Sequence, residues 1–165
     1  MHTIRFFQPD DYPSVQSIYL QGIASGDATF LSTPPDWPSW DKSKCNDCRL
    51  VATSNDQVIG WAALSPVASQ PFFSGLAEVS VYVADQAQGQ GVGNALLAAL
   101  VECSEKAGFW TLHSGIFPEN KSSIRVHEKN GFRILGVREK PARMADGRWR
   151  DVVLMERRSK TVGVD

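Results

Sequence analysis

The chain has 165 residues, of which 42% are hydrophobic, 10% aromatic and 21% charged, with a formal net charge of −1. This composition predicts a single folded domain over residues 1–165, with a core from about 3 to 158, and argues against disorder and a nucleic-acid partner. The absence of a long apolar run argues against a membrane partner or a signal peptide and predicts a cytoplasmic protein. Charge is distributed unevenly, with 5 basic and 12 acidic residues before position 120 but 12 basic and 6 acidic residues from there on.

Strand-like and helix-like segments are interleaved along the chain. Alternating or short apolar runs predict strands at residues 3–7, 50–53, 58–64, 77–83, 111–116, 132–137 and 152–156. Apolar residues at helical spacing, together with capping residues, predict helices at residues 9–26, 37–48, 92–108 and 120–130. Residues 27–38 hold three prolines and are predicted to form a structured loop. This order predicts one compact α/β domain.

The sequence favours neither a structural role for the three cysteines, in disulfides or a zinc site, nor a redox-active pair. Their odd number cannot complete a disulfide framework, and Cys45-x-x-Cys48 lacks further ligands close by for a structural zinc site. A thioredoxin-like pair would open a helix, whereas a predicted strand follows Cys48. We therefore expect two ordinary thiols near the exposed end of a helix, and no metal.

A glycine-rich turn, Gln88-Gly89-Gln90-Gly91-Val92-Gly93, lies between the most regular predicted strand and the helix that follows it. Such a turn directs backbone N–H groups and the positive end of a helix toward a phosphate. It is not a dinucleotide fingerprint, because Asn94 replaces the last glycine, and no Gly-Lys-Ser/Thr follows for a nucleoside triphosphate.

Further motifs after this turn give it a specific meaning. Together with Asn120-x-x-Ser123 and the stretch from His127 to Phe132, it resembles the acyl-CoA-binding signature of the GNAT N-acetyltransferase superfamily. Three further segments narrow the resemblance, namely 77–83, 123–128 and Gly147-x-Trp149-x-Asp151. With them the chain is similar, within that superfamily, to the phosphinothricin N-acetyltransferase family and its relatives acting on arsinothricin and methionine sulfoximine.

The resemblance extends from Thr3 to about Arg158 and implies both a fold and an activity. The implied fold is the α/β GNAT fold, a single domain with a central mixed, mostly antiparallel sheet flanked by helices. The implied enzyme transfers the acetyl group of acetyl-CoA to the amine of a small amino-acid-like antimetabolite. A homodimer is also implied. A different amine (a polyamine, an aminoglycoside or a protein N-terminus) and an acyl-CoA-sensing module remain alternatives.

Acetyl transfer requires a neutral amine, and therefore a base that accepts its proton. Glu78, on the polar face of the strand before the turn, matches the glutamate proposed as the base in this family; the alternative is a solvated charge. Backbone N–H groups near a break or bulge at Val81–Val83 would face the developing oxyanion. His127 stands where many relatives carry a tyrosine; it would protonate the leaving thiolate or relay a proton, or else be an ordinary buried histidine.

Residues expected at the cofactor come from the strand, the turn and the later helix. They are Val81, Tyr82, Val83, Gln88, Gly89, Gln90, Gly91, Val92, Gly93, Asn94, Asn120, Ser123 and Lys129. Asn120 has an equally plain role as a helix N-cap. Lys121, Arg125 and Lys129 follow one another at i, i+4 spacing, and we expect at least one of them, Lys129 first, to meet the nucleotide end of CoA.

Substrate residues are less well marked than those of the cofactor. Relatives carry a basic residue in the loop before the catalytic strand, but residues 65–75 contain none, and Gln70 is the nearest polar substitute. An acid group on the substrate is then expected at Arg148 or its neighbours Arg143 and Arg150, around Trp149, which is itself expected to be a core or interface aromatic. Thr29 and Phe30 match the family's substrate loop, although Phe30 is equally explained by packing.

Overall fold

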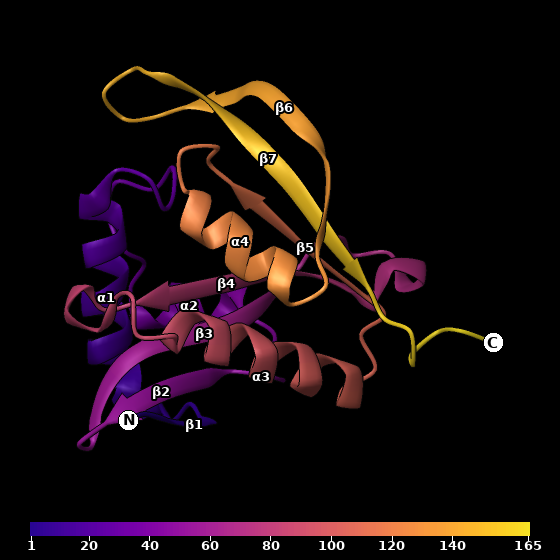
Figure 1. Cartoon of the computed structure of the whole chain (residues 1–165), viewed down its shortest axis with the longest axis horizontal. Coiled ribbons are helices and arrows are strands. Elements are labelled where there is room, and N and C mark those ends of the chain that lie inside the picture. Colours follow the sequence, from indigo (N-terminus) through magenta and orange to yellow (C-terminus); the bar gives the residue numbers. More distant parts are fainter.

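The computed structural model describes residues 1–165 and contains one mixed sheet of seven strands in the order β1-β2-β3-β4-β5-β7-β6 (Figure 1). The strands are β1 (Thr3–Phe6), β2 (Leu50–Ser54), β3 (Gln57–Pro66), β4 (Leu76–Val83), β5 (Thr111–Ile116), β6 (Arg133–Arg143) and β7 (Trp149–Arg158). Only β4 and β5 run parallel; every other neighbouring pair is antiparallel. The expected mixed, mostly antiparallel sheet is confirmed.

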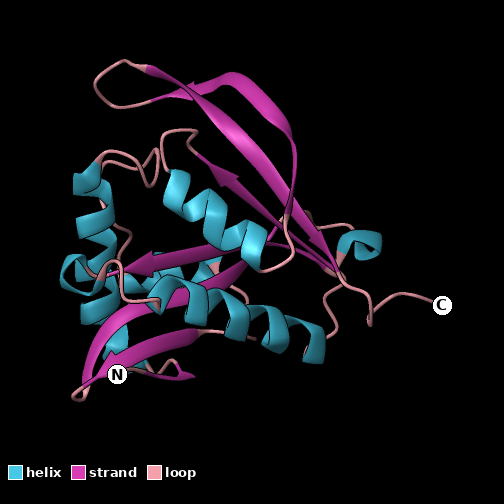
Figure 2. Cartoon of the chain, in the orientation of Figure 1, coloured by secondary structure: helices cyan, strands magenta, loops and turns pink.

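Helices cover both faces of the sheet (Figure 2). The four α-helices are α1 (Tyr12–Ser25), α2 (Trp37–Ser43), α3 (Val92–Lys106) and α4 (Lys121–Lys129), and 3-10 turns occupy Pro9–Asp11, Pro71–Phe73 and Asp85–Ala87. On one face α1 and α2 bury an aromatic cluster that includes Tyr19, Trp40 and Trp61. On the other face α3 buries Leu96 and Leu97 against the strands. None of these helices has the length and apolar character needed to cross a bilayer.

The strands β4 and β5 separate soon after they begin to pair. Their pairing covers only Leu76–Glu78, whereas β4 stays in continuous register with β3 as far as Val83. The bulge considered for Val81–Val83 is therefore absent, and the interruption lies in the pairing with β5. Ala84 N–H donates to the carbonyl of Ile59, so antiparallel alternation directs the backbone groups of Val81 and Val83 away from β3.

Three predicted elements differ by several residues from the structure. The helix expected at 37–48 ends at Ser43, because Lys44 has an extended backbone. The last two strands are longer than predicted, since the β6–β7 pairing reaches the pair Arg143 and Trp149. Most of β6 is exposed on both faces, so its sequence lacks the apolar alternation by which a half-buried strand is recognised.

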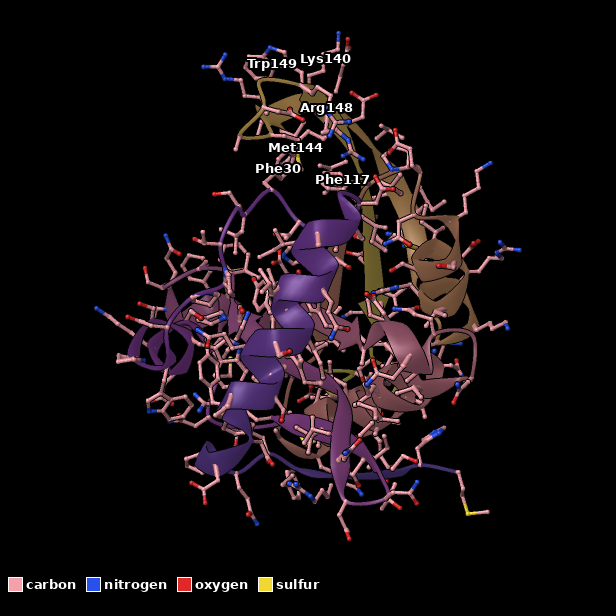
Figure 3. All side chains as sticks on the ribbon, turned by 90° about the vertical axis from the view of Figure 1, so that its left-hand side faces the viewer. Phe30, Phe117, Lys140, Met144, Arg148 and Trp149 are labelled. Atoms are coloured by element: carbon pink, nitrogen blue, oxygen red, sulfur yellow. A yellow bond between two sulfur atoms is a disulfide. The ribbon has the colours of Figure 1, made fainter.

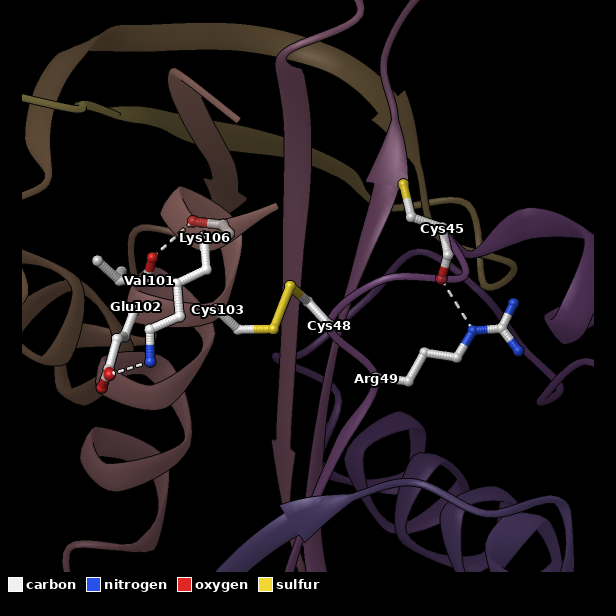
Figure 4. Close-up of a disulfide and its surroundings, with 8 residues drawn as sticks. Cys45, Cys48, Arg49, Val101, Glu102, Cys103 and Lys106 are labelled. Carbon is white, nitrogen blue, oxygen red and sulfur yellow. Dashed lines mark hydrogen bonds and ion pairs between the residues drawn. A yellow bond between two sulfur atoms is a disulfide. The ribbon is translucent and has the colours of Figure 1, made fainter. Parts of the chain in front are cut away.

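The expectation of two ordinary thiols at 45 and 48 is wrong for one of them. Cys48 is buried and forms a disulfide with Cys103 of α3, while Cys45 remains free (Figure 4). The bonded residues are 55 positions apart, and their Cα atoms come to within 5.7 Å only because α3 packs against the sheet. Sequence spacing therefore contained no signal for this pair. Disulfides are rare in a reducing cytosol, so the bond is unusual for the compartment expected from the sequence.

Candidate active site

A cavity of about 660 Å³ opens beside the end of the β4–β5 pairing. Of the residues expected at the substrate and the reaction centre, Thr29, Phe30, Glu78 and His127 line it. The ring of Phe30 meets that of Phe117 edge to face, with centroids 4.9 Å apart, and forms an apolar wall. The cavity thus has a polar floor on β4 and an aromatic side, as expected for a small polar organic ligand.

Glu78 occupies the last position at which β4 still pairs with β5. Its side chain is half-exposed, and Oε2 lies 3.9 Å from Nδ1 of His113, its partner in the parallel register. No lysine or arginine forms an ion pair with it. A carboxylate that is open to the cavity and makes no direct ion pair with a lysine or arginine is chemically able to accept a proton from an ammonium group.

A second cavity, of about 710 Å³, runs from β4 along the start of α3 to α4. It is lined by every residue expected at the cofactor except one: Val81, Tyr82, Val83, Gln88, Gly89, Gly91, Val92, Gly93, Asn94, Asn120, Ser123 and Lys129. Gln90 lies outside it, because its side-chain amide donates to the carbonyl of Gln86. The expected role of Gln90 is the one in this set that the geometry does not favour.

The N-terminus of α3 forms one side of this second cavity. Its N-cap, Gly91, has no side chain to satisfy the free N–H groups of the first turn. Gly89 and Gly91 have φ values of 73° and 80°, a backbone conformation that favours glycine, and there is open space where a Cβ would point. Free N–H donors at the positive end of a 15-residue helix fit a phosphate group.

The helix α4 closes the second cavity from the other side. Asn120 is its N-cap, as predicted, accepting from Ser123 N–H, and its amide also donates to the carbonyl of Asp27. At the far end, the Asn130 amide donates to Oδ1 of Asn94 at 2.9 Å and ties α4 to the start of α3. Of the three basic residues at i, i+4 spacing on α4, Lys121 and Lys129 line the cavity and Arg125 does not.

His127 borders both cavities, as do Val81, Tyr82, Asn120 and Ser123. Nδ1 of His127 is 2.7 Å from the carbonyl oxygen of Ser123, so Nδ1 carries the proton and donates it. In the neutral ring Nε2 is then an acceptor, and it is buried without a hydrogen-bond partner. Burial lowers the pKa of His127, while the bond to Ser123 opposes that shift, so the ring rests in its neutral form.

Three residues expected at the substrate, Gln70, Arg148 and Trp149, do not line the cavity. Arg148 pairs with Asp146 near the tip of the β6–β7 hairpin, and Trp149 is 56% exposed there, so it is not a core aromatic within the chain (Figure 3). Arg148 and Trp149 were predicted from a motif near the end of the chain, which does not determine where a hairpin tip points, and Gln70 only as the nearest polar residue in a loop without a basic one.

Arg150 is a structural cation, contrary to the expectation that it holds a substrate acid group. Its guanidinium donates to Asp27, Glu119 and the carbonyl of Gly26, and lies 4.0 Å from the centroid of the Phe117 ring. The side chain is almost fully buried. It therefore fixes the segment that carries Thr29 and Phe30 against β7, rather than binding a ligand.

Two basic residues that the sequence did not identify do line the first cavity, namely Lys44 and Arg138. Lys44 follows α2 and Arg138 lies on β6. Neither is near a recognised motif, and both depend on how distant elements are brought together. Side chains capable of forming a metal site do not gather anywhere in the chain: no group of three or more His, Cys, Asp or Glu residues is suitably placed.

Comparison with known proteins agrees with this architecture. A family model described as the acetyltransferase (GNAT) family matches residues 17–132. The chain belongs to this family. Among curated GNAT relatives, phosphinothricin N-acetyltransferase of Alcaligenes faecalis is 32% identical over 162 residues, which cover 94% of this chain and 81% of that protein.

Solved GNAT structures match over nearly the whole chain. A phosphinothricin acetyltransferase from Sinorhizobium meliloti in complex with AcCoA gives a TM-score of 0.89 at 28% identity, covering 99% of this chain and 91% of that one. A ribosomal-protein-alanine N-acetyltransferase from Brucella melitensis gives 0.87 at 31% identity, covering 95% and 99%. The fold expected from the sequence is thus confirmed, whereas the names of these proteins point to two different acceptors.

Proposed function

We propose that the protein is an acetyl-CoA-dependent N-acetyltransferase whose acceptor is a small amino-acid-like amine such as phosphinothricin, arsinothricin or methionine sulfoximine. The observation that carries the proposal is that the two cavities are adjacent and share seven lining residues, which are Asp27, Ala28, Val81, Tyr82, Asn120, Ser123 and His127. One has a free carboxylate on its floor, and the other has free helix N–H donors along its side. An acyl donor and an amine could therefore meet at the shared residues.

The second cavity would hold acetyl-CoA, which supplies the acetyl group as a thioester. The first turn of α3, with Gly89 and Gly91, would bind the pyrophosphate, and Lys129 the nucleotide end. The N–H groups of Val81 and Val83, directed away from β3 where β5 has diverged, would donate to the carbonyl oxygen on which negative charge develops.

Glu78 would act as the general base, directly or through water, because it is the free carboxylate on the cavity floor. For His127 the tautomer makes Nε2 an acceptor at rest, so the ring would have to take up a proton before it could donate one. The ammonium proton would leave through Glu78, and the second amine proton, released as the amide forms, would pass by way of Nε2 to the leaving thiolate. Burial disfavours the charged ring, so that protonated form would be short-lived.

A second copy of this chain is the partner we propose, as the family resemblance implies. β6 is an edge strand of the sheet and exposes Ile134, Leu135 and Val137. Pairing of these edges between two copies would bury that apolar row. Sedimentation velocity should then give twice the 18.2 kDa mass of one chain, whereas a single 18.2 kDa species at micromolar concentration would contradict the dimer.

An assay of thiol release tests the proposed function. The protein is incubated with acetyl-CoA and phosphinothricin, methionine sulfoximine, polyamines, aminoglycosides or alanine-terminated peptides, and free CoA is measured. Release with the amino acids, and much less with the other amines, is the expected result. Release with the peptides alone would favour the activity for which the Brucella melitensis structure is named. Cofactor binding without release from any amine would identify a sensor and contradict the proposal.

A further inference from the structure

Lys44 is a cation in the first cavity, the one proposed to hold the acceptor amine, and it forms no ion pair with a carboxylate. Its Nζ donates to the hydroxyl of Ser65 at 3.1 Å and to that of Ser80 at 3.4 Å. An ammonium group has three N–H donors, so one of them has no hydrogen-bond acceptor in the protein, although Nζ also lies 5.8 Å from the centroid of the Trp61 ring. Because Lys44 also lines the cavity, this remaining donor is available to a ligand there.

The two serines place this ammonium group next to the proposed base. Ser65 is directly opposite Glu78 in the β3–β4 register, and Ser80 is two residues beyond Glu78 on the same face of β4. Burial lowers the pKa of Lys44, while the nearby charge of Glu78 partly opposes that shift. A partly buried cation whose charge is disfavoured by its surroundings gains most from an anion that enters the cavity.

The position of this cation selects one part of an acceptor molecule. In an α-amino acid the amine and the carboxylate are attached to the same carbon, so an amine held near Glu78 has its carboxylate close by. The distal end of the side chain extends several bonds further away. We propose that Lys44 is a specificity-determining residue that binds the carboxylate next to the reacting amine, so that free α-amino acids are preferred over amines that lack this carboxylate.

This inference rests on the proposed function and sharpens it. The loop at 65–75, where relatives carry a basic residue, has none in this chain, and Lys44 supplies a positive charge to the same cavity from the end of α2. Polyamines would be repelled by this cation, and peptide N-termini have an amide where the carboxylate would be. Arg138, which is exposed on β6 and lines the same cavity, remains available for a second acid group.

A matched pair of acceptors tests the role of Lys44. L-methionine sulfoximine and its α-carboxamide have the same side chain and amine and differ in the charge next to that amine. The ratio of their kcat/KM values is measured for the wild type, Lys44→Met and Lys42→Met, since Lys42 is an exposed lysine of α2 two residues earlier. Lys44→Met should lower the acid-to-amide ratio by about 10- to 100-fold, chiefly through KM for the acid.

The controls separate recognition from a general structural effect. Lys42→Met should keep the wild-type ratio, and Lys44→Arg, which retains the charge, should keep more of it than Lys44→Met. Equal losses for the acid and the amide in Lys44→Met would overturn the proposal, because only a structural role affects both equally. In that case the activity of the wild type on the acid would still stand, so the proposed function would survive.

A binding measurement keeps the test independent of turnover. The desamino analogue of methionine sulfoximine and its amide cannot be acetylated, and calorimetry gives their Kd on the protein saturated with acetyl-CoA. We expect the wild type to bind the carboxylate at least tenfold more tightly than the amide, and Lys44→Met to bind the two about equally. No preference for the carboxylate in the wild type would refute the role of Lys44, whatever the catalytic result.

Discussion

At the scale of single residues, the protonation state of His127 determines how the site can move a proton. The Ser123 carbonyl fixes the proton on Nδ1, and burial lowers the pKa of the ring. Because the shift is downward, the neutral ring persists to a lower pH than the ordinary value of about 6.5. At a pH low enough to protonate the resting ring, Nε2 becomes a donor and can no longer accept the proton that a relay would transfer.

The lowered pKa of His127 predicts a fall in activity on the acidic side of the pH profile. The kcat/KM of the wild type should fall as the pH drops through an apparent pKa below about 6.5. His127→Gln should lower kcat at neutral pH and shift or remove that limb, whereas His2→Gln, near the N-terminus, should leave the profile unchanged. An identical limb in His127→Gln would show that His127 is not the group that titrates.

Other single residues show why motif position alone is a weak guide to a ligand site. Arg150 and Trp149 are neighbours in the motif near the end of the chain, yet Arg150 is buried against Asp27 and Trp149 is exposed. Their different positions depend on the loop and the hairpin tip around them. Lys44 could not have been predicted, because its place in the cavity depends on β3 and β4 rather than on its own helix.

At the scale of secondary-structure elements, prediction succeeded where one face of an element is buried. β4 alternates strictly and was found almost to the residue, and α3 carries a clear apolar stripe. In β4 the polar residues are the even-numbered ones, and this alternation places Glu78 on the face toward the cavity. The full length of β6 was not predicted, because neither of its faces is covered within one chain. The divergence of β4 from β5, which creates the site, is a relation between strands that no single strand encodes.

The disulfide joins the segment just before β2 to α3, and the effect of its removal on stability should be measurable. Closing a loop of 55 residues is expected to stabilise the fold by about 2 to 4 kcal/mol. The double variant Cys48→Ser/Cys103→Ser should therefore lower Tm by about 5 to 15 °C, and Cys45→Ser should change it little. Thiol titration of the unfolded, unreduced protein should find one free thiol. Three free thiols after purification under oxidising conditions would contradict the bond.

At the scale of the whole molecule, the uneven distribution of charge along the sequence places basic residues of α4 beside the second cavity. The basic final quarter supplies α4, and two lysines of that helix line the cavity proposed for acetyl-CoA. The turn at 88–93 contains glutamines and no basic side chain, so only the N–H groups of α3 would face the phosphates there. The lysines of α4 supply the positive charge that this turn lacks. The overall charge of −1 conceals this local arrangement.

Lys129→Ala tests that arrangement, with Arg125→Ala as its matched control on the same helix. Lys129→Ala should weaken acetyl-CoA binding about fivefold, as expected for an exposed ion pair, and should affect dephospho-CoA less. Arg125→Ala, which lies outside the cavity, should alter neither. If Lys129→Ala weakens both ligands equally, or weakens neither, a contact with the 3′-phosphate is ruled out.

The turnover of Glu78→Gln tests directly whether Glu78 is the general base. The substitution keeps the shape of the side chain and removes the base, while Glu102→Gln, an exposed glutamate of α3 paired with Lys106, is the control. With an acceptor that releases thiol in the wild type, Glu78→Gln should lower kcat about 100-fold or more near neutral pH and leave the Kd of acetyl-CoA unchanged. Turnover equal to that of the wild type would contradict the account.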